Sequence, residues 1–181
     1  MILQMLLLTS EITRIIATIV ILYTLKIPIF YKILLIMLLD KLDCSHMSYP
    51  YTGPMFSKDT SICKTLKYQK YDKIADTICY ALILIYILEY DCTNKHLLIA
   101  LFMYRLLGTC LFLNTDDKKY LIYFPNFFLE TSLALMALKN FPGIKPFKQQ
   151  IFIIVFAFKI LQENYLHGSP GKMLSNSSSS T

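Results

Sequence analysis

Six stretches of the chain are strongly apolar, and polar segments separate most of them. They cover about 12–27, 28–40, 74–90, 96–113, 120–138 and 149–162. Apolar residues fill these runs without strict alternation with polar ones, which favours helices over strands. Several runs are shorter than the ~20 residues that a lone membrane-spanning helix needs. Shorter spans are tolerated in a bundle of tilted helices, so the pattern predicts an all-α fold of six helices.

Prolines mark two of the boundaries between these runs. Pro28 divides the first two runs and predicts a tight helical hairpin, because proline cannot donate the backbone hydrogen bond of a helix interior. The segment FPGIKP at 141–146 divides the last two runs for the same reason. The closing stretch 167–181 is rich in serine and low in complexity. We therefore expect one helical domain over 1–166, followed by a disordered tail.

Composition changes the prediction from a soluble bundle to a membrane protein. The chain has 181 residues, of which 55% are hydrophobic, and its mean hydropathy is +0.49. Too little polar sequence remains to cover a core of this size in water. Within lipid, only helices and closed barrels satisfy the backbone. We therefore expect a polytopic membrane helix bundle with six transmembrane helices and the lipid bilayer as its partner, and we expect no binding to nucleic acid.

The distribution of lysine predicts the orientation in the membrane. With six spans, both termini, the segment 41–73 and the loop 114–119 lie on one side, which holds more lysines than the other. Lysine-rich segments tend to stay in the cytosol, so we expect both termini there. The first side carries Lys41, Lys58, Lys64, Lys67, Lys70, Lys73, Lys118, Lys119 and Lys172, and the second carries Lys26, Lys95, Lys139, Lys145 and Lys148.

Four of the 12 acidic residues flank the segment 41–73. Asp40 and Asp43 close the second apolar run in LLDKLDC, and Asp72 and Asp76 open the third run in YDKIADT. Spacings of three and four residues place each pair on one face of a helix. The ends of two consecutive helices can lie side by side, so we expect the four carboxylates to converge at the cytosolic edge of the membrane.

Converging carboxylates repel one another unless a cation neutralises them. Ligand sets made only of oxygen suit Mg²⁺ or Mn²⁺, and four carboxylates are enough for two metal ions. One carboxylate could then act as a general base. The alternative is that these acids mark the points where helices meet water, and Asp72 would then gain from the positive end of a helix dipole.

Two arginines and one glutamate add charge to the apolar runs. Arg105 lies in the fourth run, where a charged side chain is usually functional or paired. Arg105 would bind a substrate phosphate, pair with Glu130 or extend its charged end to the membrane surface. Arg14 in ITRII would bind phosphate near the acids or neutralise Glu11. The five cysteines and three histidines are dispersed and include no CxxC pair, which argues against a metal site of the Cys/His kind.

The acidic pattern resembles that of the CDP-alcohol phosphatidyltransferases, six-span membrane enzymes with the signature DxxDGxxAR…GxxxDxxxD. Asp40-Lys-Leu-Asp43 is similar to its first aspartate pair, and Asp72-Lys-Ile-Ala-Asp76 is similar to its second. The ITRII stretch is similar to the polar start of the family's first helix. The resemblance extends over roughly 8–165, and its specific part is 40–76.

The resemblance implies an activity and a role for each aspartate. Asp40, Asp43 and Asp72 would be metal ligands, and Asp76 would be the general base with a metal contact. Two Mg²⁺ or Mn²⁺ ions would bind the diphosphate of a CDP-linked lipid. An alcohol acceptor would attack the phosphorus, which releases CMP and forms a new phosphodiester in phospholipid synthesis. The resemblance also allows for a homodimer.

Four positions depart from the family signature. Cys44 and Tyr68 stand where the family has its two glycines, and Met47 and Ser48 stand where it has Ala-Arg. In the family these positions surround the CDP group. The departures therefore concern nucleotide binding and leave the aspartates intact.

Three basic residues are the candidates for substrate binding. Lys64 and Lys67 would replace the missing arginine, although a lysine lacks the bidentate fork of a guanidinium. Arg105 is the third candidate. Two further functions remain open: a family relative without catalysis that acts as a membrane structural or lipid-binding protein, and a channel or carrier with an acidic cation site at its mouth.

Overall fold

The computed structural model describes residues 2–48, 66–90 and 94–167, and its regular structure within these ranges is entirely helical. The prediction of an all-α fold is therefore confirmed. The predicted tail falls almost wholly outside the described residues. The helices are α1 (Ile2–Thr24), α2 (Ile29–Ser48), α3 (Leu66–Tyr90), α4 (Lys95–Thr115), α5 (Lys119–Tyr123), α6 (Phe127–Asn140), the 3₁₀ helix η3 (Pro142–Phe147) and α7 (Lys148–His167).

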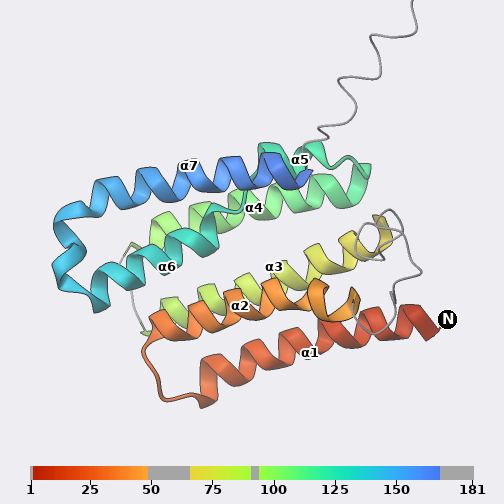
Figure 1. The fold of residues 1–181 in the computed structure, drawn as a ribbon, viewed down its shortest axis with the longest axis horizontal. Helices are drawn as coiled ribbons and strands as arrows, with labels where there is room; N and C mark the ends of the chain where they lie inside the picture. The colour runs from red at the N-terminus through yellow and green to blue at the C-terminus, as the bar shows by residue number, and fades with distance from the viewer. Residues whose placement is uncertain (1, 49–65, 91–93, 168–181) are drawn as a thin grey trace, which may run out of the picture.

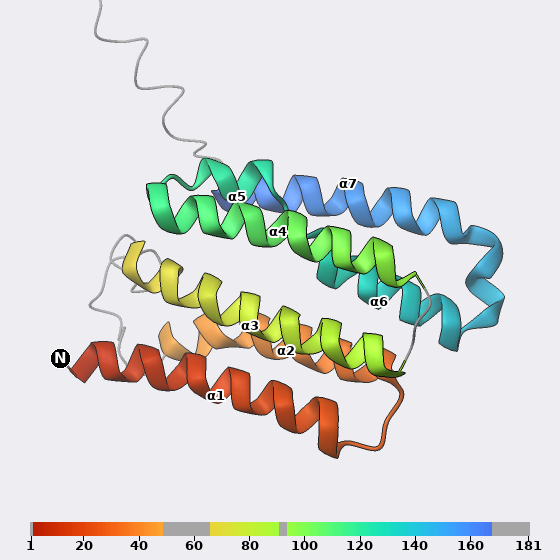
Figure 2. The same cartoon turned by 180° about the vertical axis from the view of Figure 1, so that it is seen from behind.

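The helices form an elongated bundle with two groups. Figures 1 and 2 show α1, α2 and α3 on one side and α4, α5, α6 and α7 on the other, with the long helices running along the same axis. Contacts of α3 with α4 and of α2 with α6 join the two groups. Within the first group, α1 packs against both α2 and α3, and this arrangement positions the charged side chains described below.

The predicted boundary at Pro28 is present, and its carbonyl accepts hydrogen bonds from the N–H groups of Tyr31 and Lys32 at the start of α2. The segment 141–146 ends α6 as predicted, but Pro142–Phe147 continues as a 3₁₀ helix. The fifth apolar run also differs from the prediction of one helix. It forms α5 and α6, because Pro125 lies between them and has no N–H to donate.

Two helical segments in the described part of the chain are long and apolar enough to cross a membrane. They are Lys95–Thr115, with a mean hydropathy of 1.8, and Lys119–Asn140, with a mean hydropathy of 1.4. The second includes α5, the break at Pro125 and α6. Length and composition are the only basis for this statement, and the buried core helix of a soluble protein passes the same test.

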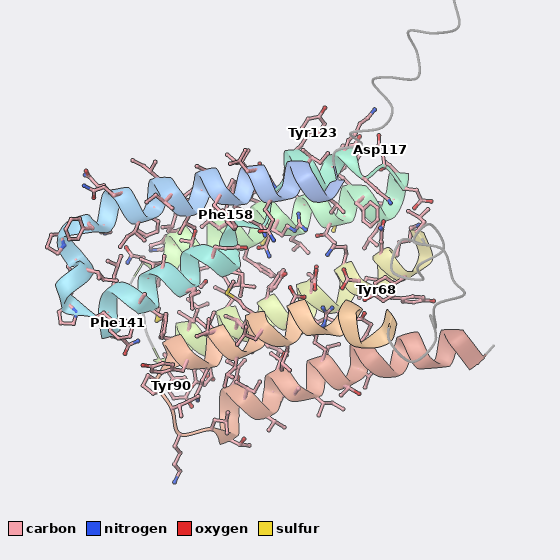
Figure 3. The ribbon with its side chains drawn as sticks, in the orientation of Figure 1. Tyr68, Tyr90, Asp117, Tyr123, Phe141 and Phe158 are labelled. Carbon is pink, nitrogen blue, oxygen red and sulfur yellow. The ribbon has the colours of Figure 1, made fainter. Side chains whose placement is uncertain are left out.

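The apolar core lies between the two groups of helices. Ile33 of α2, Ile83 of α3, Leu98 of α4 and Phe128 of α6 are completely buried there. The outer surface of α7 differs from this core, since Ile153, Ile154, Phe158 and Leu161 are each at least 65% exposed; Phe158 is labelled in Figure 3. Apolar side chains therefore occupy both the inside of the bundle and the outer face of α7.

Candidate metal centre

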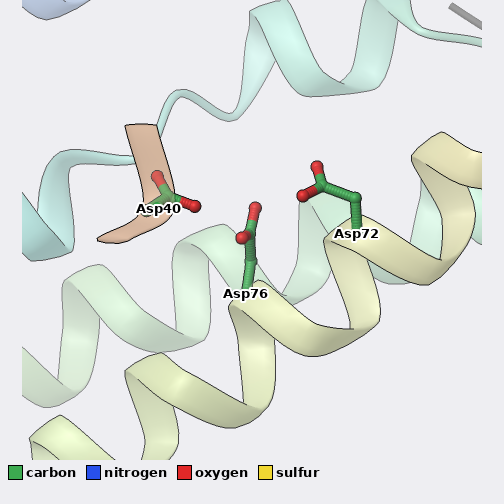
Figure 4. Close-up of side chains that lie close together, drawn as sticks. All are labelled: Asp40, Asp72 and Asp76. Atoms are coloured by element: carbon green, nitrogen blue, oxygen red, sulfur yellow. The ribbon is translucent and has the colours of Figure 1, made fainter. Parts of the chain in front are cut away.

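Three of the four predicted aspartates converge in the structure. Asp40 lies in the second half of α2, and Asp72 and Asp76 lie one turn apart in the first half of α3. Each offers one carboxylate oxygen, and these oxygens all lie within 4.8 Å of one another (Figure 4). The spacing of four residues places Asp72 and Asp76 on the same helix face. Asp76 is the most buried of the three, with a side chain that is 6% exposed.

Arg14 of α1 lies against all three carboxylates. Its Nη1 atom is 2.7 Å from Oδ1 of Asp40 and 3.3 Å from Oδ1 of Asp72. Its Nη2 atom is 3.0 Å from Oδ1 of Asp76. The arginine itself is buried. One guanidinium therefore joins α1 to the acids of both α2 and α3, and its five N–H donors in a planar fork suit several partners at once.

The same guanidinium makes two further contacts. Nη2 donates to Oε2 of Glu11 over 2.7 Å, one turn earlier on α1. It also donates to the backbone carbonyl of Asp72 over 3.1 Å. Glu11 is buried as well, so the cluster contains a fourth carboxylate that adds negative charge beside the aspartates.

Lys73 is the second cation of the cluster. Its Nζ atom lies 2.7 Å from Oδ2 of Asp72 and 2.7 Å from Oδ2 of Asp76. Burial by itself would lower the pKa of this ammonium, but the negative charges of Asp76 and Asp72 outweigh burial and raise the pKa. Lys73 therefore stays positively charged at neutral pH.

The charges of the described cluster do not cancel. The described contacts join four carboxylates to two cations, Arg14 and Lys73. The carboxylates belong to Glu11, Asp40, Asp72 and Asp76. Within these contacts the carboxylates outnumber the cations, so a divalent cation would reduce the repulsion among the carboxylates. Carboxylate oxygens are the ligands that Mg²⁺ and Mn²⁺ prefer. Donor chemistry and charge both fit such an ion.

The remaining candidates from the sequence are placed differently. The backbone of Asp43 lies in α2, but its side chain is outside the described residues, as is that of Lys67 in the first turn of α3. Lys64 lies outside the described residues altogether. Tyr68 is described: it is buried one turn before Asp72 on α3 (Figure 3).

Arg105 is buried in α4. In its described contacts it donates hydrogen bonds to backbone carbonyl groups and not to a carboxylate. Its Nη1 atom donates to the carbonyl of Phe124 over 2.6 Å and more weakly to that of Leu121 over 3.4 Å. These carbonyls lie at the end of α5, where the helix stops before Pro125. The suggested pairing with Glu130 is not what the structure has, since Glu130 forms an ion pair with Lys159 of α7 at 2.7 Å.

The ion pairs of Lys73 with Asp72 and Asp76 were not predicted from the sequence. Lys73 was counted only among the basic residues of the segment 41–73. A signal was present, because Lys73 precedes Asp76 by three residues and such pairs meet on a helix surface. Glu11 and Arg14 have the same spacing, and their pairing was one of the alternatives that the sequence left open.

Comparison with known proteins gave no match to a family model, to a curated protein or to a solved structure. Function is therefore inferred from the geometry and charge of the cluster, together with the resemblance of its aspartates to a family signature.

Proposed function

We propose that this protein is a multi-pass membrane enzyme that uses Mg²⁺ or Mn²⁺ to transfer a phosphatidyl-like group from a CDP-activated lipid to an alcohol, with release of CMP. The observation that carries the proposal is the convergence of Asp40, Asp72 and Asp76 from two helices within 4.8 Å. The same aspartates are the ones that resemble the signature of the CDP-alcohol phosphatidyltransferases.

Two features support the membrane part of the proposal. Large apolar side chains cover the outer face of α7, as described above, and others are exposed on α1, including Ile16 at 55% and Val20 at 46%. Exposing such apolar faces to water costs free energy, whereas contact with lipid avoids this cost. In the proposed six-span arrangement, the ends of α2 and α3 that carry the aspartates face the cytosol.

Each aspartate has a role in the proposed reaction. Asp40 and Asp72, together with Asp43, hold the divalent cation, which when bound neutralises charge on the diphosphate of the donor. Asp76 accepts the proton of the acceptor hydroxyl. The hydroxyl oxygen forms a bond to the lipid-linked phosphorus as the bond between that phosphorus and the CMP oxygen breaks, so CMP leaves with the electron pair.

A second function is favoured by a specific observation. Arg14 and Lys73 already contact the three aspartates at 2.7–3.3 Å, so much of their charge is neutralised within the protein. Tyr68 also fills a position where the family has a glycine. Both observations suit a relative that keeps the acidic cluster as a structural element or a lipid-binding site and has lost catalysis.

The test is an assay of CMP release by the purified full-length protein in lipid, with CDP-diacylglycerol, Mg²⁺ or Mn²⁺ and a panel of alcohols. We expect release that stops on chelation of the metal. Asp76→Asn should lower the rate by roughly 10²–10⁴-fold, because it removes the general base.

Glu89→Gln is the matched control, since Glu89 is an exposed acid on the same helix. This variant should keep the rate of the unmodified protein. An unchanged rate in Asp76→Asn would overturn the assigned base. Binding of Mn²⁺ without CMP release from any alcohol would favour the non-catalytic relative.

A further inference from the structure

A cavity of about 350 Å³ lies where α6, η3, α7 and the start of α4 meet. Its apolar wall is formed by Leu135, Met136 and Leu138 of α6. Asn94, which precedes α4, also lines it. A cavity of this size is in the lower part of the range that small-molecule sites occupy.

The cavity lies far from the aspartates. Asp76 and the end of α3 at Tyr90 are separated by fourteen residues of helix, which corresponds to roughly 20 Å along the axis. Asn94 follows soon after Tyr90, and Figures 1 and 2 show the junctions α3–α4 and α6–α7 at the same end of the bundle. The cavity and the acidic cluster therefore belong to different ends of the molecule.

The charge of the cavity is opposite to that of the acidic cluster. Lys139, Lys145 and Lys148 line it, and its lining contains no acidic residue. Within the described part of the chain, no carboxylate forms an ion pair with Lys145 or Lys148. An anionic group at this place would be attracted by all three ammonium groups.

We propose that this cavity binds the anionic headgroup of a phospholipid in the leaflet opposite the acidic cluster. The three lysines contact the headgroup phosphate, and the acyl chains lie along the apolar wall and over Phe141 and Phe147, which are 42% and 58% exposed. The inference relies on insertion of the bundle into a membrane. It does not rely on transferase activity, so an inactive protein would still be expected to bind this lipid.

The chain contains no tryptophan, which permits a single fluorescent reporter. Phe147→Trp places one beside Lys148 at an exposed position outside the cavity lining. The full-length protein with this substitution is reconstituted in phosphatidylcholine vesicles that contain either brominated phosphatidylglycerol or brominated phosphatidylcholine. We expect half-maximal quenching at a far lower fraction of the anionic lipid than of the zwitterionic one. Equal quenching by the two lipids would overturn the proposal, and this comparison requires no lysine variant.

Lysine variants test the site itself. Each lysine near an anionic lipid surface raises the affinity roughly fivefold. A triple variant should therefore weaken the preference for anionic over zwitterionic lipid on the order of a hundredfold. It combines Lys139→Gln, Lys145→Gln and Lys148→Gln. Lys26→Gln with Lys95→Gln is the matched control, because both lysines are exposed at the same end and neither lines the cavity. An equal effect of the control pair would overturn the proposed site. Displacement of the lipid by inorganic phosphate alone would also contradict it, since the acyl chains would then contribute nothing.

Discussion

The two groups of helices each bury one arginine, and the two arginines have different surroundings. Arg14 in α1 contacts three aspartates and Glu11 from three helices. Arg105 in α4 donates to two backbone carbonyls at the end of α5. Both are at most 6% exposed. Burial of a cation is therefore not by itself a sign of function, and the identity of its partners distinguishes the two sites.

Carbonyl groups and carboxylates have different consequences for chemistry. The carbonyls that Arg105 binds are left without helical partners because Pro125 interrupts the chain, so this arginine completes a local structure. The carboxylates around Arg14 outnumber the cations that contact them and leave negative charge in a partly buried place. The first site therefore has the carboxylate ligands that divalent cations such as Mg²⁺ prefer, whereas the described contacts of Arg105 are with backbone carbonyls.

The largest effect is expected for Arg14→Met. Removal of this guanidinium leaves two buried carboxylates and two half-buried ones without their main cation, which should lower the free energy of unfolding by about 3–5 kcal/mol. Thermal unfolding followed by circular dichroism in detergent measures the loss. Mn²⁺ should restore part of the stability, because it can replace the missing positive charge. If the variant is as stable as the unmodified protein, Arg14 is not the main cation that stabilises the acidic cluster.

Arg105→Met should lower the free energy of unfolding by less, and Mn²⁺ should not restore the loss. The loss of charge-assisted hydrogen bonds to the carbonyls of Leu121 and Phe124 should cost about 1.5–3 kcal/mol. The same unfolding experiment in the presence of Mn²⁺ provides the comparison, and we expect no recovery. Recovery of stability on addition of Mn²⁺ would show that Arg105 belongs to the acidic cluster after all.

Gly108→Ala tests the packing around the same break in the chain. An added Cβ would lie 2.2 Å from Cβ of Phe124, and this atom cannot move without its backbone. Overpacking should lower the free energy of unfolding by about 1–3 kcal/mol. The better helix propensity of alanine partly offsets this, so the free energy of unfolding should fall by about 1 kcal/mol in total. Gly143→Ala is the control, because its Cβ would meet nothing within 4 Å. A more stable Gly108→Ala protein would contradict the close contact.

The sequence was sufficient to predict the helical fold and the convergence of three aspartates. The apolar runs correspond to helices in the structure, and the fifth run is divided at Pro125. The spacing of Asp72 and Asp76 fixed their common face, and Asp40 joined them because helices α1, α2 and α3 pack together. The spacing within one helix can be recognised without a structure, whereas the approach of Asp40 depends on the packing of α1 against both α2 and α3.

Partners that come from distant parts of the chain could not be predicted in the same way. Nothing in the sequence indicates that Arg14 contacts Asp76, sixty-two residues later, or that Arg105 binds the carbonyl of Phe124. The break between α5 and α6 was missed because Pro125 lies in an otherwise apolar run. The cavity at the α6–α7 junction depends on how α6, η3, α7 and the start of α4 meet, and the sequence showed its lysines only as charges outside the apolar core.

The most direct test of the metal centre is the binding of Mn²⁺ to the purified protein, measured by electron paramagnetic resonance of the free ion. We predict binding that weakens by about tenfold or more in Asp72→Asn and Asp76→Asn, since each removes a carboxylate of the cluster. Glu89→Gln should bind as the unmodified protein does. Absence of binding, or binding equally strong in all of these variants, would contradict the assignment of the acidic cluster as a divalent metal site.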